Sequence, residues 1–314
     1  MRIIFFGTAD FAVPSLEAIH RSSHEVVLVV TQPDRKKGRH LKVTSSPVKE
    51  KAVSLGLEVF QPPLASSRDS IDAIRKYNAD LFAVVSYGQI LSEDLLKTPS
   101  KFCINLHSSL LPEYRGAAPI NWAIINGDER TGVSVIRMTA KMDAGDVILS
   151  EAEEIRDADT GISLSERLSK KGAPALLKAI DQVASGKAVF EKQDESRITY
   201  APKLKKTDGS IDWNLSAKQI CGRVRGLQPW PSAFTYFQGR MLKITGAVPV
   251  EARDSGAKAG QVIEVSEAKG IVIKAGKGAI AVKELQLEGK KAMAAGEFLR
   301  GHKIGAGEIF RLAI

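Results

Sequence analysis

The sequence predicts an α/β domain built on a parallel sheet, followed by a smaller all-β domain. Over the first 138 residues, apolar strands alternate with helices, which is typical of a parallel sheet covered on both faces. After Asp208 the rhythm changes, and short β runs at regular spacing indicate a small barrel or sandwich. The length of 314 residues agrees with this division, since it corresponds to about two domains.

The alternation begins with an apolar run over Arg2–Phe6, a helix opened by Pro14, and a β-branched run over Glu25–Val30. This order of strand, helix and strand is the start of a βαβ unit. The same patterns then predict strands over Leu57–Phe60, Leu81–Val85, Phe102–His107 and Val133–Met138, and helices over Asp69–Tyr77, Ser92–Leu96 and Pro119–Asn126.

A helical stripe of apolar residues follows between Ala173 and Ile180. Pro174 lies inside this stripe and predicts a kink or a helix start. From Asp181 to Asp208 the pattern weakens, which indicates a connector. Beyond it we expect a helix over Ala217–Val224, a hairpin of Ala233–Phe237 with Met241–Val248 turning at Gln238-Gly239, and strands over Gln261–Val265, Gly270–Ile273 and Ile280–Leu287.

The net charge of +9 is unevenly distributed along the chain. Residues 1–200 hold 26 basic and 26 acidic residues, whereas residues 201–314 hold 19 and 10. Such asymmetry indicates a polyanionic partner such as nucleic acid, with a merely solubilising basic surface as the alternative. A second basic cluster, residues 35–42, contains five Lys or Arg residues and no acid. It is either a phosphate-contacting arm that orders on binding or a solvated loop.

Composition excludes several classes of protein. No apolar run approaches the ~20 residues that a bilayer span requires, which argues against an integral membrane protein. Cys103 and Cys221 are the only cysteines, so a disulfide framework is not expected and a reducing compartment is favoured. The histidines and cysteines show no metal-ligand spacing. We therefore expect a cytoplasmic protein without a bound metal.

One group of polar residues has the composition of a catalytic site. Asn105 and His107 share a face at the carboxyl end of a predicted strand, where ligands bind in open α/β sheets. Asp143 lies in a turn after a later strand and is expected to reach the same end of the sheet. The Asn amide offers donors to an oxyanion, the His holds or moves a proton, and the Asp orients the His. A strand end and a turn that are polar by chance remain the alternative.

No activated nucleophile accompanies these three residues. Ser108 and Ser109 lack the G-x-S-x-G elbow, which indicates direct attack by a substrate nucleophile on a bound carbonyl carbon. The loop after the first strand, 7–12, is not G-x-G-x-x-G and disfavours a dinucleotide site. That loop either binds part of a substrate or is a simple turn. Arg115 either holds an anionic substrate or belongs to the turn before the next helix.

The sequence resembles the methionyl-tRNA formyltransferases, and the resemblance covers nearly the whole chain. No catalytic position departs from the pattern of that family. The matching segments are Arg2–Phe6 with Gly7-Thr8, Asn105–Pro112, Arg115–Pro119, Met142–Asp146, Tyr200–Leu204 and Arg225–Pro231.

The resemblance implies a fold, a reaction and a set of partners. It implies a Rossmann-like formyltransferase domain over residues 1–189, a linker over 190–208, and an OB-like, tRNA-binding β-barrel over 209–314. The implied reaction moves the formyl group of 10-formyltetrahydrofolate to the α-amino group of methionine on initiator tRNA. Nothing in the sequence requires a metal or more than a monomer.

The resemblance also assigns residues. Asn105, His107 and Asp143 correspond to catalytic positions of the family. The remaining assignments are Ser109, Leu110, Leu111 and Pro112 to the folate site, and Arg35, Lys36, Lys37, Arg39 and Lys42 to the tRNA acceptor arm.

Three other functions compete with this interpretation. A formyltransferase of the same fold that acts on a small amine, such as a nucleotide sugar or purine precursor, would share the catalytic residues but has no need of the basic loop. A nicotinamide-dependent oxidoreductase would need the missing glycines. A non-catalytic RNA-binding protein would leave the Asn, His and Asp without a purpose.

Overall fold

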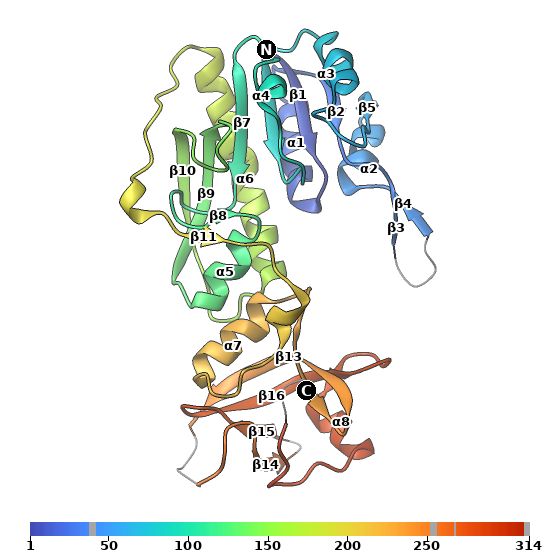
Figure 1. Ribbon diagram of the computed structural model, residues 1–314, viewed down its shortest axis with the longest axis vertical. Coiled ribbons are helices and arrows are strands. Elements are labelled where there is room, and N and C mark those ends of the chain that lie inside the picture. The colour runs from blue at the N-terminus through green and yellow to red at the C-terminus, as the bar shows by residue number, and fades with distance from the viewer. Residues whose placement is uncertain (38–41, 252–255, 267, 311–314) are drawn as a thin grey trace. The chain divides into compact units, whose positions relative to one another are not determined.

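The computed structural model describes residues 1–37, 42–251, 256–266 and 268–310 (Figure 1). The chain forms two compact units. The N-terminal unit comprises Met1–Gly116, Thr131–Glu154 and Ser165–Ala201, and the C-terminal unit comprises Ala117–Arg130, Ile155–Leu164 and Pro202–Ile314. The domain boundaries expected at residues 189 and 208 stay predictions. No helix in the described ranges is long and apolar enough to cross a membrane.

The N-terminal unit is built on a seven-stranded sheet with the order β10-β9-β7-β6-β1-β2-β5. Its strands are β1 (Arg2–Gly7), β2 (Glu25–Val30), β5 (Val59–Phe60), β6 (Leu81–Val85), β7 (Phe102–His107), β9 (Arg130–Arg137) and β10 (Val147–Glu154). The pairings that join β5, β2, β1, β6 and β7 are all parallel, which confirms the predicted parallel sheet for these strands. However, β9 runs antiparallel to β7, so the sheet as a whole is mixed.

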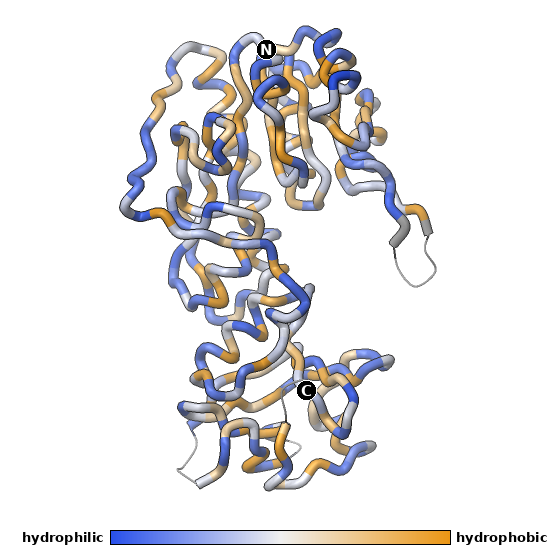
Figure 2. Tube along the Cα trace, in the orientation of Figure 1, coloured by the Kyte–Doolittle hydropathy of each residue, from blue (hydrophilic) through white to orange (hydrophobic). Residues whose placement is uncertain are grey.

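Helices pack on both faces of this sheet. They are α1 (Val13–His20), α2 (Pro47–Ser54), α3 (Arg68–Arg75), α4 (Glu93–Leu96) and the long α6 (Gly161–Ala184). On one face, Ile74 of α3 and Leu95 of α4 belong to the same buried cluster as Phe6 of β1. On the other face, Leu106 of β7 lies against Gly172 of α6. Figure 2 shows the hydrophobic residues that follow the central strands between these two layers.

Proline does not start the long helix. Pro174 lies inside α6, which already begins at Gly161, so one of the two alternatives predicted for this residue is wrong. The helix continues through the proline because its apolar stripe stays buried on both sides, from Leu164 and Leu168 to Leu176.

Several short elements carry no strong periodicity and are not predicted by it. In α2, Ser46 accepts a hydrogen bond from the Lys49 amide at 3.1 Å and Pro47 occupies the first turn, which together start the helix. The others are the hairpin of β3 (Arg35–Lys37) and β4 (Lys42–Thr44), the pair of β8 (Arg115–Gly116) and β11 (Tyr200–Ala201), and the 3-10 turns over Asp10–Ala12, Glu195–Arg197 and Lys206–Gly209.

The C-terminal unit contains an antiparallel sheet with the order β12-β13-β16-β15-β14. Its elements are α5 (Pro119–Asn126), α7 (Ala217–Gly226), β12 (Ala233–Phe237), β13 (Arg240–Val250), β14 (Val262–Ser266), β15 (Gly270–Lys274), β16 (Ala279–Leu287), β17 (Met293–Ala294) and α8 (Ala295–Gly301). Ile220 and Val224 of α7 pack into the same core as Leu285 of β16. Within the described ranges no pairing joins β12 to β14, so the expected OB-like barrel is an antiparallel sheet that does not close.

Candidate active site

The carboxyl end of β7 presents two polar side chains on one face. Cys103 points into the buried cluster under α3 and α4, whereas Leu106 points to α6 on the opposite face. Because side chains alternate along a strand, Asn105 and His107 lie on the face of Cys103, as predicted. Parallel strands leave a ligand-binding edge at their carboxyl ends, and His107 is the last residue of β7.

His107 is buried between a backbone carbonyl and a carboxylate. Its side chain is 6% exposed, and its Nε2 lies 2.9 Å from the Tyr114 carbonyl oxygen. A carbonyl only accepts hydrogen bonds, so Nε2 carries a proton and donates it. The other nitrogen, Nδ1, faces Asp143 Oδ2 at 3.7 Å, which is an ion-pair distance rather than a hydrogen bond. Nδ1 is therefore the nitrogen that is able to gain and lose a proton.

Asp143 reaches His107 by a different route from the one expected. Because β9 runs antiparallel to β7, it ends at Arg137 opposite Ile104, away from the carboxyl end of β7. The loop after β9 returns toward β9, where the Arg137 amide donates to the Asp146 carbonyl at 2.9 Å. Thus the sequence predicted the right neighbour for His107, but the direction assumed for the strand was wrong.

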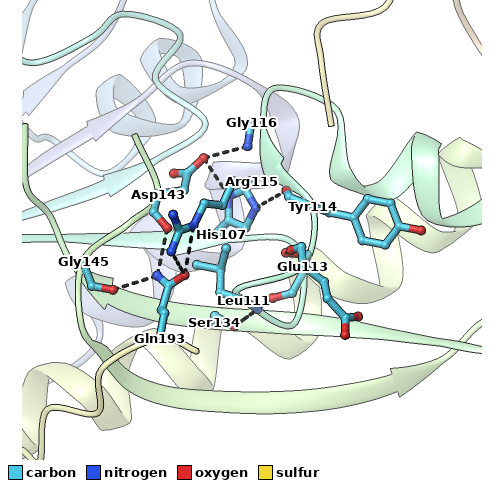
Figure 3. Close-up of polar contacts among 11 residues, drawn as sticks. His107, Leu111, Glu113, Tyr114, Arg115, Gly116, Ser134, Asp143, Gly145 and Gln193 are labelled. Carbon is cyan, nitrogen blue, oxygen red and sulfur yellow. Dashed lines mark hydrogen bonds and ion pairs between the residues drawn. The ribbon is translucent and has the colours of Figure 1, made fainter. Parts of the chain in front are cut away.

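The turn around Asp143 has an unusual backbone. Asp143 itself has φ of +49°, in the left-handed region that side chains other than glycine rarely occupy. A Cβ at Gly145 would lie 1.6 Å from the Arg137 carbonyl oxygen, so this position admits only glycine. The Gly116 amide donates to Asp143 Oδ2 at 2.9 Å and aims the carboxylate (Figure 3).

Asn105 differs from its neighbours because its amide is available. The side chain is half-buried, and it makes no hydrogen bond to any part of the chain that the structure describes. Its two N–H donors therefore remain for a ligand beside His107. This arrangement suits stabilisation of an oxyanion.

The loop after β7 is held by hydrogen bonds of its own. Ser134 Oγ of β9 donates to the Ser109 carbonyl at 2.8 Å and accepts from the Leu111 amide at 3.1 Å. Ser109 Oγ donates to the Glu113 carbonyl at 2.6 Å, so this hydroxyl shapes the loop. Leu110 and Leu111 are half-buried and Pro112 is buried. Contact of these four residues with folate stays a prediction.

Arg115 turns into the protein and does not face solvent. Only 3% of it is exposed, and its Nε and Nη2 donate to Gln193 Oε1 at 3.0 and 2.6 Å. These contacts favour the second alternative for Arg115, a residue that belongs to the turn before the next helix. Gln193 is not singled out by the sequence. Its Nε2 donates to the carbonyls of Asp143 and Gly145, both at 2.8 Å (Figure 3).

The cysteines are poor candidates for a nucleophile. Cys103 and Cys221 are both free and buried. Burial raises the pKa of both thiols, that of Cys221 to about 11, which keeps them protonated at neutral pH. This agrees with a reaction in which a substrate attacks directly. In the described ranges no three His, Cys, Asp or Glu side chains are grouped to hold a metal ion.

The basic cluster at residues 35–42 lies partly on a hairpin. Arg35–Lys37 form β3 and Lys42 begins β4, so part of the segment expected as an arm that orders on binding or as a solvated loop is paired in two short strands. Arg35 Nη2 donates to Gln32 Oε1 at 2.5 Å. Arg39 lies outside the described residues. Contact of this segment with tRNA stays a prediction.

Comparison with known proteins identifies the family. A model described as formyl transferase matches residues 1–180, and one described as formyl transferase, C-terminal domain matches residues 203–303. A methionyl-tRNA formyltransferase of Lachnospira eligens is 44% identical over 311 residues, covering 98% of each chain. One from Pelotomaculum thermopropionicum is 45% identical over 301 residues, covering 96% of each. The chain belongs to the methionyl-tRNA formyltransferase family.

Solved structures agree with this fold. The methionyl-tRNA formyltransferase from Clostridium thermocellum superposes with a TM-score of 0.57 at 16% identity, covering 79% of this chain and 93% of that one. HypX from Aquifex aeolicus in complex with tetrahydrofolic acid gives a TM-score of 0.63 at 19% identity, covering 98% of this chain but 50% of HypX. At these identities the two similarities concern the fold alone.

Proposed function

We propose that this protein transfers a formyl group from 10-formyltetrahydrofolate to the α-amino group of methionine on initiator methionyl-tRNA. The observation that carries this proposal is the 44–45% identity, over nearly full length, to relatives named methionyl-tRNA formyltransferase. The pairing of His107 with Asp143 beside the available amide of Asn105 supports it, because acyl transfer to an amine needs these groups. We assign catalytic roles to these three residues.

The proposed chemistry needs no covalent intermediate with the protein. The folate co-substrate supplies an electrophilic formyl carbon, and the amine attacks in its neutral form. An α-amino group has a pKa near 8, so an appreciable neutral fraction exists at about pH 7–8. Asn105 donates its amide N–H to the oxygen that becomes negative during attack. His107, protonated on Nδ1 as well as Nε2, stabilises the same charge.

Proton transfer completes the reaction. A new C–N bond to the amine forms and the C–N bond to the folate nitrogen breaks, so one proton must leave the amine and one must reach the folate. His107, charged at the start, gives its Nδ1 proton to the folate nitrogen and takes up on Nδ1 the proton that leaves the amine, because Nε2 is committed to the Tyr114 carbonyl. Asp143 Oδ2, 3.7 Å from Nδ1, pairs with the imidazolium that is present at the start and restored at the end.

The basic regions account for the second substrate. We assign Arg35, Lys36, Lys37, Arg39 and Lys42 to contacts with tRNA phosphates, supported by the charge of the cluster and the fold of β3 and β4. The excess of 19 basic over 10 acidic residues after residue 200 gives the C-terminal domain the same role. Ser109, Leu110, Leu111 and Pro112 are assigned to the folate site. We expect a cytoplasmic monomer.

A formyl-transfer assay tests the proposal. Purified protein is given 10-formyltetrahydrofolate and methionyl initiator tRNA, with free methionine as the control acceptor and a His107→Ala variant alongside. We expect formylation of the charged tRNA alone, lost in the variant. Formyl release or transfer to small amines without formylation of the tRNA would instead indicate a small-amine formyltransferase or a hydrolase.

A further inference from the structure

The reactive Asp143 belongs to a closed ring of contacts that includes a residue far away in the sequence. Its carboxylate accepts from the Gly116 amide at 2.9 Å, and its own carbonyl accepts from Gln193 Nε2 at 2.8 Å. Gln193 Oε1 in turn accepts two hydrogen bonds from the guanidinium of Arg115, the residue before Gly116. Asp143 is thus held at both its main chain and its side chain (Figure 3).

The orientation of the Gln193 amide is fixed by its neighbours. The guanidinium of Arg115 has only donors, so it selects the amide oxygen, while the carbonyls of Asp143 and Gly145 only accept and select the nitrogen. All four hydrogen bonds agree with a single orientation of the amide. A carboxylate at the same position would keep the contact with Arg115 but would turn an acceptor toward two carbonyls.

The segment that carries Gln193 is itself anchored next to the reactive loops. Glu191 and Val147 exchange two backbone hydrogen bonds at 2.8 and 2.9 Å. Farther along, Thr199 accepts from the Arg115 amide at 2.9 Å through its carbonyl and from the Tyr114 amide at 2.8 Å through its hydroxyl. The segment therefore contacts the loop that orients His107 as well as the loop that carries Asp143.

The strained backbone of the loop that carries Asp143 explains why the loop needs the contacts with Gln193. Asp143 has φ of +49°, a conformation that persists only where the surroundings over-determine it. Gln193 binds the carbonyls on either side of Ala144, which is the part of the loop where that conformation must be kept.

We propose that Gln193 is a positioning residue that acts through Asp143 and sets the placement of its carboxylate against His107. This inference rests on the proposed function, since it concerns the reaction of the same site. Gln193 touches neither His107 nor Asn105 through any described contact, so its effect on the reaction is indirect. Misplacement of a catalytic group by about 1 Å costs up to ~100-fold in rate.

The test compares Gln193→Ala and Gln193→Glu with Lys192→Ala, an exposed neighbour on the same segment. Both substitutions at Gln193 should lower kcat about 10- to 100-fold and leave the KM for each substrate within about threefold, because substrate binding is not touched. Gln193→Glu should lower the melting temperature less than Gln193→Ala, since its pairing with Arg115 survives and offsets part of the cost of turning an acceptor toward two carbonyls. Lys192→Ala should match the wild type in kcat.

A double-mutant cycle separates positioning from a structural role. In an Asp143→Asn background, adding Gln193→Ala should cost less than about twofold, because the group that Gln193 places is already lost. Full additivity of the two losses would overturn the proposal. So would a Gln193→Glu variant with wild-type kcat.

A second readout does not depend on activity. Amide hydrogen exchange of residues 141–146 should be faster in Gln193→Ala than in the wild type and unchanged in Lys192→Ala. Equal exchange would overturn the positioning role even if the protein formylated another substrate. Faster exchange in Gln193→Ala, together with a wild-type protein that does not formylate tRNA, would support the positioning role of Gln193 and reject only the proposed function.

Discussion

The proposed reactive edge, made of the carboxyl end of β7 and the loop that carries Asp143, and the basic hairpin of β3 and β4 are built into the fold in different ways. At the reactive edge, Asp143 and His107 are 14% and 6% exposed and have fixed partners from distant segments. On the hairpin, β3 and β4 form a separate sheet of two short strands, and Val43 between its basic residues is 66% exposed. His107 and Asp143 are thus tied to distant segments, whereas the hairpin stands as a separate two-stranded sheet.

This difference matches what each region is proposed to do. Stabilising a developing charge requires donors that are already in place, because reorganisation during the reaction would cost rate. Attracting a phosphate backbone requires positive charge near a flexible polyanion, and it tolerates imprecise geometry. Substitutions at the reactive edge should therefore change kcat, whereas substitutions on the hairpin should change affinity and its salt dependence.

The largest effect is expected at Asn105. Asn105→Ala should lower kcat by about 10²–10³-fold, the usual loss for one oxyanion donor, which equals about 3–4 kcal/mol of transition-state stabilisation. Single-turnover formyl transfer at saturating substrates measures this loss. The melting temperature should change little, because the amide has no partner among the described residues. Near-wild-type turnover would remove Asn105 from the mechanism.

The second-largest effect is expected at Gly116, whose backbone packs closely against Ala201 of β11. A Cβ there would lie 2.5 Å from the Ala201 carbonyl oxygen, and φ is +127°. Gly116→Ala should lower the free energy of unfolding by about 2–3 kcal/mol and also lower kcat, because the amide that aims Asp143 moves. Denaturant unfolding and the formylation assay measure the two effects.

Gly186 provides the matched control. It also has a positive φ, at +69°, but no atom lies within 4 Å of the position that a Cβ would occupy there. Gly186→Ala should therefore cost only about 1 kcal/mol and leave kcat unchanged. If both variants lost the same stability, close packing against Ala201 would not be the reason that position 116 is glycine.

A smaller effect is expected on the basic hairpin. Lys36→Ala with Lys37→Ala should raise the KM for tRNA about 10-fold at low salt, equivalent to about 1.4 kcal/mol, and reduce the salt slope by about 1–2. The KM for folate and kcat should stay constant. Lys76→Ala with Lys101→Ala is the control, because these two exposed lysines precede β6 and β7 and so lie near the amino ends of the strands. This pair changes the net charge by the same amount and should leave the salt slope unchanged. If both pairs changed the KM for tRNA equally, the hairpin would act on tRNA binding only through the net charge of the protein.

Some of the reactive edge could be predicted because it depends on local periodicity. Asn105 and His107 share a face because strand side chains alternate, and they lie at the end of a parallel strand, as the pattern of strands and helices predicts. The position of Asp143 could not be derived in the same way. It depends on the antiparallel direction of β9 and on the return of the following loop, and neither has a sequence signature.

Other features were beyond sequence reasoning because they are long-range. Gln193 lies 50 residues from Asp143, in a stretch without periodicity, and nothing in its neighbourhood marks it as part of the site. Closure of a barrel depends on whether the first and last strands pair, which short β runs do not reveal. By contrast, α2 carries a readable signal, since Ser46-Pro47 is a good helix start that periodicity alone misses.

The smallest effect is expected at Glu153, a carboxylate of the N-terminal unit that is fixed by ion pairs but has no part in the proposed chemistry. Glu153 of β10 pairs with Lys171 at 2.9 Å and Arg167 at 3.1 Å, both on α6, and is 13% exposed. The hydrogen bond from Lys171, followed by the charge of Lys171 and the contact with Arg167, lowers the pKa of Glu153. Glu153→Gln should lower the free energy of unfolding at pH 7 by about 0.5–1 kcal/mol.

The pH dependence of this loss follows from the direction of the pKa shift. A carboxyl whose pKa is lower in the folded than in the unfolded state adds stability that is complete above the ordinary value of 4.5 and is lost as pH falls through the folded pKa. The stability difference between wild type and Glu153→Gln, measured by urea unfolding, should therefore be constant from pH 6 to 8 and shrink below about pH 4.5. Unchanged kcat would show that fixed partners alone do not make a charge catalytic, and that the contribution of Asp143 comes from its placement beside His107. A large loss of kcat in Glu153→Gln would instead mean that β10 and α6 help to place the reactive loop.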